Sequence, residues 1–187
     1  MIEGSYLQHH LLIAMPGMVD RNFSQTVTYL CEHNADGALG IIINRPSDLR
    51  LSQLMTQMEL PPPERPEFDG PVYHGGPVSE ERGFVLHEEA GPWDASLFVS
   101  KAMHVTTSRD ILMAIAKGEG PSRYLLALGY AGWTAGQLEQ EMRDNAWLAV
   151  PANSHILFDL PAPERLTAAI GLLGVDWRQL SSEAGHA

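Results

Sequence analysis

The sequence of 187 residues predicts a single α+β domain. Segments with the two-residue alternation of a β-strand gather in the first half of the chain, and helical segments are interspersed irregularly. This order favours an α+β domain over the regular strand–helix alternation of a doubly wound sheet. We find no internal repeat, and the length is that of one domain. We therefore expect one domain over residues 1–180 and a flexible tail over residues 181–187.

The first expected element is an antiparallel hairpin. Residues 26–31 alternate as a strand, with Val27, Tyr29 and Cys31 on one face. Residues 33–37 contain an Asp-Gly turn, and the Ile-rich segment 38–44 follows as the second strand.

A short helix over residues 51–59 follows, because Leu51, Leu54, Met55 and Met58 recur at helical spacing. Four prolines between residues 61 and 66 end this helix, and we expect a loop there. Short strands are expected over residues 72–74, 83–87 and 97–100.

The second half combines helices with the last strands. Capping signals and apolar spacing define them. In order, we expect a helix that begins after Thr107 or Ser108 and ends before Gly118, a strand over 124–130, a helix from the Thr134–Gln137 capping box to Asn145, strands over 147–150 and 155–158, and a helix over 163–173.

The composition excludes several classes of protein. Twelve basic residues face 23 acidic ones, a formal charge of −11, and the basic residues are dispersed along the chain. Direct binding to nucleic acid draws on clustered Lys and Arg, so we expect no direct nucleic-acid partner. No apolar run approaches the roughly 20 residues of a membrane helix. With one cysteine and no signal-peptide pattern at the start of the chain, we expect a cytoplasmic protein with no membrane partner.

Cys31 and His33 form the first candidate constellation, because residues two apart on a strand share a face. A thiol beside an imidazole could act as a nucleophile. The pair could also supply two metal ligands, but no companion cluster completes a zinc site, and we expect neither a metal nor a cofactor. The favoured interpretation is that Cys31 is buried and inert and that His33 begins the turn.

His74-Gly75-Gly76-Pro77 is the most chemically suggestive segment. A similar stretch supplies oxyanion donors in some α/β-hydrolases, whose nucleophile lies in a Gly-x-Ser-x-Gly elbow. The nearest counterpart, residues 129–133, has Ala131 where that serine belongs. The serine-hydrolase reading fails there, and a tight turn is the favoured role of both glycine segments. We assign no catalytic residue.

Several polar and glycine residues nevertheless gather at predicted strand ends, where binding sites commonly lie. If these ends lie on one side of the sheet, Arg45, the glycine amides and the helix that begins at Thr134 would form a pocket for a small anionic ligand. The opposing interpretation is that Arg45 pairs with an acid of its own fold and the glycines only turn the chain. The hypothetical ligand-binding residues are Asn44, Arg45, His74, Gly75, Gly76, Gly129, Gly132 and Trp133.

Read together, these segments resemble the AlgH/YqgE family of bacterial proteins. The similarity covers essentially the whole chain. Its longest motifs are Leu-Leu-Ile-Ala-Met-Pro at 11–16, Gly-Ala-Leu-Gly-Ile-Ile-Ile-Asn-Arg-Pro at 37–46, His-Gly-Gly-Pro-Val at 74–78, Arg-Gly-Phe-Val-Leu-His at 82–87 and Leu-Gly-Tyr-Ala-Gly-Trp at 128–133. The resemblance implies strongly bent, mostly antiparallel sheets around a few helices in a cytoplasmic bacterial protein. The family is largely uncharacterised and carries a transcriptional-regulator label, so no catalytic residue can be carried over.

The expected function is a non-enzymatic binding or regulatory module that acts on an unknown protein or a small anionic ligand. Two alternatives remain open. One is an enzyme, built on the Cys31 thiol or on a degenerate hydrolase-like pocket. The other is a direct DNA-binding regulator, which follows from the family label and is opposed by the charge of −11.

Overall fold

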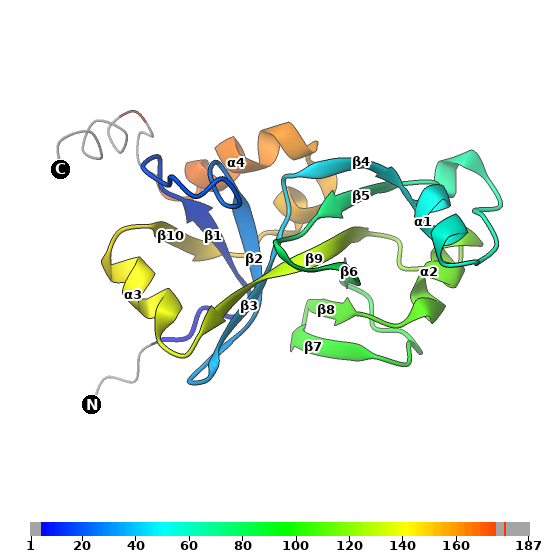
Figure 1. The fold of residues 1–187 in the computed structure, drawn as a ribbon, viewed down its shortest axis with the longest axis horizontal. Helices are drawn as coiled ribbons and strands as arrows, with labels where there is room; N and C mark the ends of the chain where they lie inside the picture. Colours follow the sequence, from blue (N-terminus) through cyan, green and yellow to red (C-terminus); the bar gives the residue numbers. More distant parts are fainter. Residues whose placement is uncertain (1–4, 175–177, 179–187) are drawn as a thin grey trace.

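The computed structural model of the protein describes residues 5–174 and residue 178 (Figure 1). The strands are β1 (His10–Ala14), β2 (Val27–Asn34), β3 (Gly37–Ile42), β4 (Pro46–Arg50), β5 (Pro71–His74), β6 (Val78–His87), β7 (Ser96–Ser100), β8 (Met103–Thr106), β9 (Tyr124–Thr134) and β10 (Trp147–Pro151). The helices are α1 (Leu51–Gln57), α2 (Arg109–Ala116), α3 (Gln137–Arg143) and α4 (Ala162–Gly171), with a 3₁₀ turn at Pro66–Phe68 and a π-helical turn at His155–Asp159. The expected tail, residues 181–187, lies outside the described residues.

The strands form one curled sheet in the order β10-β1-β2-β3-β9-β6-β8-β7. Neighbours along this order are antiparallel, whereas β5 joins β9 in parallel and carries β4 on its other side. The predicted hairpin is confirmed as β2 and β3, with Asn34 opposite Gly37 across the turn. The α+β class with bent, mostly antiparallel sheets is therefore confirmed.

Strand β9 connects the two halves of this sheet and crosses the middle of the molecule in Figure 1. Its C-terminal end pairs with β3, and its N-terminal part pairs with β6 and β5. At Gly129, between these parts, the backbone has φ +80°, a left-handed conformation that L side chains rarely adopt. A Cβ atom on Gly129 would lie 2.4 Å from the carbonyl oxygen of Gly76. The bend therefore depends on two chain segments whose backbones touch.

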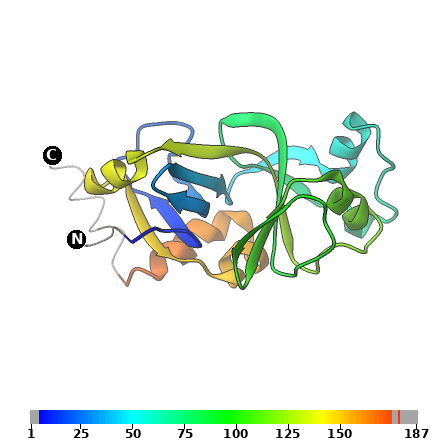
Figure 2. The ribbon, with the colours of Figure 1, turned by 90° about the horizontal axis from the view of Figure 1, so that it is seen from below.

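Helices cover the sheet unevenly along its length. Helix α4 packs on the β1–β2 half through Ala169 and Ile170, and α1 and α2 cover β6 and β9 at the opposite end of the molecule (Figure 2). On the other face of β1 and β2, Trp133, Leu138 and Trp147 form a further apolar cluster. Strand β2 is therefore buried on both faces, which explains why its polar Thr28 has no exposed surface.

Two sequence-based assignments are wrong. Residues 155–158 form the π-helical turn rather than a strand, because the Asn153 side chain accepts a hydrogen bond from the Ile156 N–H and its carbonyl accepts one from Leu157. Helix α3 begins after Gly136 rather than at Thr134, which is the last residue of β9. Gln137 still accepts the Thr134 N–H bond of the expected capping box, at 3.0 Å. Strands β1, β4 and β8 were not predicted.

None of the helices in the described residues has both the length and the apolar character needed to cross a membrane.

Candidate functional site

A pocket of about 410 Å³ lies between α1, α2 and the face of the sheet made by β6, β8 and β9. We call it the α1–α2 pocket. Binding sites for small molecules are commonly hollows of about 300–1,000 Å³ with an apolar interior and a few polar groups. The α1–α2 pocket has this composition. Its lining residues are Leu54, Gln57, Met58, Glu80, Glu81, Gly83, Val85, Thr106, Thr107, Ser108, Arg109, Leu112, Leu126 and Leu128.

The apolar interior follows from strand register and helix periodicity. Val85 of β6 lies directly opposite Leu126 of β9, so both side chains point to the same face of the sheet. Helix α1 adds Leu54 and helix α2 adds Leu112 from above that face. All four side chains are buried in one cluster. Gly83, two residues before Val85, leaves room between them, because a Cβ there would meet only Leu128, at 3.9 Å.

Polar side chains at the mouth of the pocket are exposed and uncommitted. Gln57, Glu81, Thr107 and Arg109 form no side-chain hydrogen bond or ion pair with any part of the chain that the structure describes. Glu80, the remaining charged residue of the mouth, forms one ion pair within the described residues, with the His74 imidazole 3.8 Å from its carboxylate. The mouth thus offers a bound molecule hydrogen-bond donors and acceptors, together with charges of both signs.

The N-terminal end of α2, which forms one wall, is held rigidly. The Ser108 hydroxyl donates to Asp110 at 2.5 Å and accepts from the Ala95 N–H. Burial alone would raise the pKa of Asp110, but hydrogen bonds from Ser108 and from the N–H groups of Asp94 and Ile111 outweigh it and lower that pKa. The wall beside Thr107 is therefore fixed to the loop before β7.

A second hollow of similar volume lies at the β2–β3 hairpin, and we call it the hairpin groove. Gly132, Trp133 and Thr134 of β9 line it opposite Glu32, Asn34 and Asp36. Two of its polar side chains already have partners within the groove, since Asn34 donates to Glu32 at 3.2 Å and accepts from the Asp36 N–H at 2.8 Å. The buried Trp133 indole donates to Glu141 at 2.6 Å. The hairpin groove therefore has fewer uncommitted polar groups than the α1–α2 pocket.

Among the residues that the structure describes, Arg45 forms no salt bridge with an acid, which the opposing interpretation expected. Its guanidinium donates to three backbone carbonyls of the loop before β2, those of Arg21, Asn22 and Ser24, at 2.5–2.9 Å. Asn44 joins the same loop, accepting from the Val27 N–H and donating to the Gln25 carbonyl. Both side chains fasten this loop to the end of β3.

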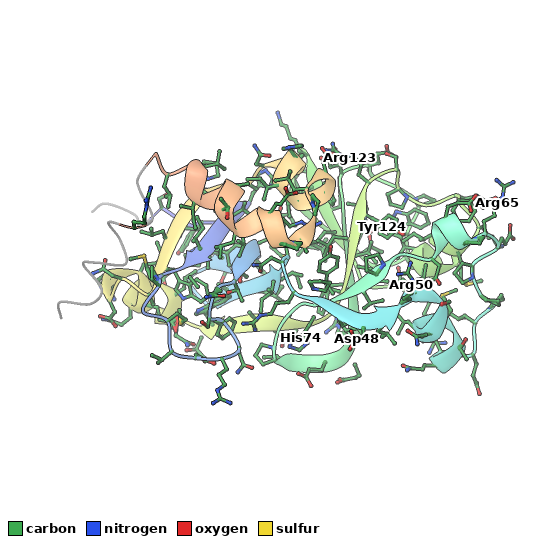
Figure 3. All side chains as sticks on the ribbon, turned by 90° about the horizontal axis from the view of Figure 1, so that it is seen from above. Asp48, Arg50, Arg65, His74, Arg123 and Tyr124 are labelled. Atoms are coloured by element: carbon green, nitrogen blue, oxygen red, sulfur yellow. The ribbon has the colours of Figure 1, made fainter. Side chains whose placement is uncertain are left out.

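The glycines at the strand ends lie where two backbones cross. The Gly75 N–H donates to the Leu128 carbonyl at 2.8 Å, and the Ile42 N–H donates to the Gly75 carbonyl at 2.8 Å. Both the N–H and the carbonyl of Gly75 are therefore hydrogen-bonded to neighbouring strands. His74 lies beside them near the middle of the molecule, half-buried at the end of β5 (Figure 3). The structure therefore brings His74, Gly75, Gly76 and Gly129 together, and places Gly132 and Trp133 in the hairpin groove.

Cys31 is fully buried, as expected, among the side chains of the main core. Burial raises the pKa of its thiol, and the neighbouring Glu32 adds to the shift. His33, two residues on, instead donates to Glu139 at 2.8 Å while its other ring nitrogen accepts the Leu7 N–H. The two side chains have separate partners. Among the described residues, no group of three or more His, Cys, Asp and Glu is arranged to hold a metal ion.

The residues of the α1–α2 pocket were absent from the sequence-based site. The sequence predicted a helix that begins after Thr107 or Ser108 and the strand 83–87, but as structural elements only. The pocket forms because β6 pairs with both β8 and β9 and because α1 and α2 cover the same face. No local sequence pattern predicts that β6 pairs with both β8 and β9.

Comparison with known proteins agrees with the resemblance noted in the sequence. A UPF0301 protein of Methylococcus capsulatus is 55% identical over 98% of this chain and 98% of its own length. The solution structure of the AlgH protein from Pseudomonas aeruginosa is similar over 100% of this chain and 99% of that one, with a TM-score of 0.81 and 52% identity. A Corynebacterium diphtheriae crystal structure with 20% identity, covering 91% of this chain and 88% of its own, shares the fold, at a TM-score of 0.68. The AlgH-like family model matches residues 11–178, and the chain belongs to the AlgH-like family.

Proposed function

We propose that the protein is a binding module whose α1–α2 pocket takes a small amphipathic molecule with an apolar chain and an uncharged, hydrogen-bonding end. The observation that carries the proposal is the contrast within one pocket between a buried apolar interior and four uncommitted polar side chains at its mouth. An uncharged end suits this mouth, because Glu80 and Glu81 oppose an anion and Arg109 opposes a cation.

The strand-end residues 44–45, 74–76, 129 and 132–133 remain a prediction as a site for an anionic ligand. We base the proposal on the α1–α2 pocket instead, because Arg45, the cation expected to attract an anion, already donates to three carbonyls. We place the module in the cytoplasm and assign any regulatory role to its bound ligand or to a partner protein. The charge of −11 supports a route that avoids direct contact with DNA.

Calorimetric titration with butanamide, hexanamide and octanamide tests the proposal. Each added pair of methylene groups should contribute about 1.6 kcal/mol of apolar burial. That corresponds to an affinity gain of about 15-fold until the pocket is filled. Octanoate and octylamine should bind more weakly than octanamide, because a charged end gives up more hydration on entering the mouth than an amide does. Glu80 and Glu81 also repel octanoate.

Two glycine variants form a matched pair for this test. Gly83→Leu places a side chain inside the α1–α2 pocket, and Gly132→Leu places one in the hairpin groove, where a Cβ would meet the Tyr130 ring at 3.4 Å. Both sites are strand positions with space for a side chain. We expect Gly83→Leu to weaken octanamide binding by at least about tenfold and Gly132→Leu to leave it unchanged. The reverse pattern, or no gain in affinity with chain length, would refute the proposal.

A further inference from the structure

Beside the α1–α2 pocket, three side chains form a continuous hydrogen-bonded chain that the binding proposal does not use. The Ser96 hydroxyl lies 2.5 Å from the Thr106 hydroxyl, and the Thr106 hydroxyl lies 2.6 Å from Nε2 of His87. Nδ1 of His87 lies 2.7 Å from the Glu89 carbonyl oxygen. These four groups come from β7, β8, β6 and the loop that follows β6.

Strand register places this chain at the margin of the pocket. Leu126, Val85, Thr106 and Ser96 lie opposite one another across β9, β6, β8 and β7, so they form one row on one face of the sheet. The first three line the pocket, and Ser96 is the next position in the row, on the outermost strand. Thr106 and His87 are fully buried, whereas Ser96 is exposed. Ser96 is therefore the exposed hydroxyl of the chain, next to the Thr106 hydroxyl that borders the pocket.

The partner of Nδ1 fixes the direction of every hydrogen bond. A carbonyl oxygen only accepts, so Nδ1 carries the imidazole proton and Nε2 of the neutral ring presents a lone pair. The Thr106 hydroxyl must then donate to Nε2, and its oxygen accepts from the Ser96 hydroxyl. A proton can leave Ser96 through Thr106 and reach His87 without any side chain moving.

We propose that Ser96 is a nucleophile that accepts the acyl group of an activated ester or thioester whose apolar chain occupies the α1–α2 pocket. This inference rests on the proposed function for the position of the acyl chain and on the Ser96–Thr106–His87 chain for the chemistry. Only Ser96 forms a covalent bond to the substrate, Thr106 relays the proton, and His87 acts through Thr106 as a positioning residue.

The step balances as an acyl transfer. The Ser96 oxygen forms a bond to the acyl carbon, its proton passes to Thr106, and the Thr106 proton passes to Nε2 of His87. The bond from the acyl carbon to the leaving oxygen or sulfur then breaks. That atom takes a proton from the Thr106 hydroxyl, which lines the pocket beside Ser96, and His87 returns its proton to Thr106. Water hydrolyses the acyl-serine by the same steps, so ester and water yield acid and alcohol, or acid and thiol, with no oxidant or metal required.

The surroundings of His87 restrict the substrate to activated esters. In the part of the chain that the structure describes, no carboxylate hydrogen-bonds to its ring. The groups that face it are Thr106, His104, stacked at 5.6 Å, Tyr124 opposite it on β9, and Glu89, through its carbonyl and through the charge of its carboxylate. Burial, with His104 as a smaller cause, lowers the pKa of His87, although the hydrogen bond to the Glu89 carbonyl and the charge of the Glu89 carboxylate oppose the shift. A weakly basic imidazole favours substrates with a good leaving group over amides.

The test uses p-nitrophenyl octanoate with the full-length protein, following p-nitrophenolate release and mapping the acylated peptide by mass spectrometry. We expect an octanoyl group on Ser96 and a release rate at least about 100-fold above that of Ser96→Ala. Ser100→Ala, on the same strand, should match the wild type. Thr106→Val should lose the activity and Thr106→Ser should restore it, because only the hydroxyl is needed.

A pH profile separates a proton route from a purely structural role. The rate should fall as His87 becomes protonated, with an inflection below the ordinary histidine pKa of about 6.5. Acylation elsewhere, or equal rates for Thr106→Val and Thr106→Ser, would overturn the inference while octanamide binding could still stand. Acylation of Ser96 that is insensitive to Gly83→Leu and equal for acetyl and octanoyl esters would instead refute the pocket.

Discussion

Replacing Gly129 by alanine tests whether the bend in β9 depends on close backbone approach. Gly129 and Gly136 have nearly the same left-handed backbone, with φ +80° and +76°. They differ in their surroundings: a Cβ at Gly129 would lie 2.4 Å from the Gly76 carbonyl oxygen, whereas nothing lies within 4 Å of one at Gly136. Gly136→Ala is therefore a control for the conformational cost alone.

The expected magnitudes follow from these two environments. A left-handed alanine costs about 1–2 kcal/mol, and the lost flexibility of the unfolded chain offsets about 0.4–1 kcal/mol of that. Gly136→Ala should thus lower the free energy of unfolding by about 1 kcal/mol. At Gly129 the overlap with a backbone oxygen forces a shift of the two segments, which adds about 1–3 kcal/mol, so the total is about 2–4 kcal/mol.

Urea unfolding followed by tryptophan fluorescence measures both variants. Equal m-values would show that the midpoints report stability alone. If Gly129→Ala costs no more than Gly136→Ala, the two backbones can separate without penalty. The explanation of the bend would then be wrong.

Three further predictions concern buried and anchoring side chains. Arg45→Ala should speed proteolysis within residues 20–25, measured by limited digestion, because it removes three hydrogen bonds from that loop; an unchanged digestion rate would refute the anchoring role. Cys31 should react slowly with a disulfide reagent in native buffer and rapidly in denaturant, because burial raises the pKa of its thiol; immediate labelling of the native protein would contradict this. Because the pKa of His87 is lowered on folding, the unfolded chain binds more protons below pH ~6.5, and stability should fall as the pH drops from there towards the folded pKa. His9 has a pKa lowered in the same direction, so the slope of stability against pH just below about 6.5 should be reduced, not abolished, in His87→Gln; an unchanged slope would refute the assignment to His87.

The sequence predicted those parts of the fold that local pattern determines. The β2–β3 hairpin was found because its turn chemistry and its alternation lie within 19 residues, 26–44. Residues 155–158 were misassigned because a bond from the Asn153 side chain decides their conformation. Gly75, Gly76 and Gly129 were singled out as tight-turn or hypothetical ligand-binding positions, whereas the structure shows a backbone crossing there that no single segment reveals.

The α1–α2 pocket and the Ser96–Thr106–His87 chain depend on pairing between distant segments. Thr106 belongs to β8, a strand that sequence analysis did not predict, and its partners are 10 and 19 residues away. Gly83 looked like the start of a strand, and only the register of β6 with β9 shows that it faces a cavity. Side-chain chemistry of this kind becomes visible only after the strand order is known.

Amide chemical-shift mapping with octanamide tests the central claim, ligand binding in the α1–α2 pocket, most directly. We expect saturable shifts that are largest at Gly83, Thr107 and Leu112, which line this pocket from β6, the β8–α2 connection and α2. Shifts centred on Gly132 and Trp133, or no saturable shift at any amide, would contradict the account.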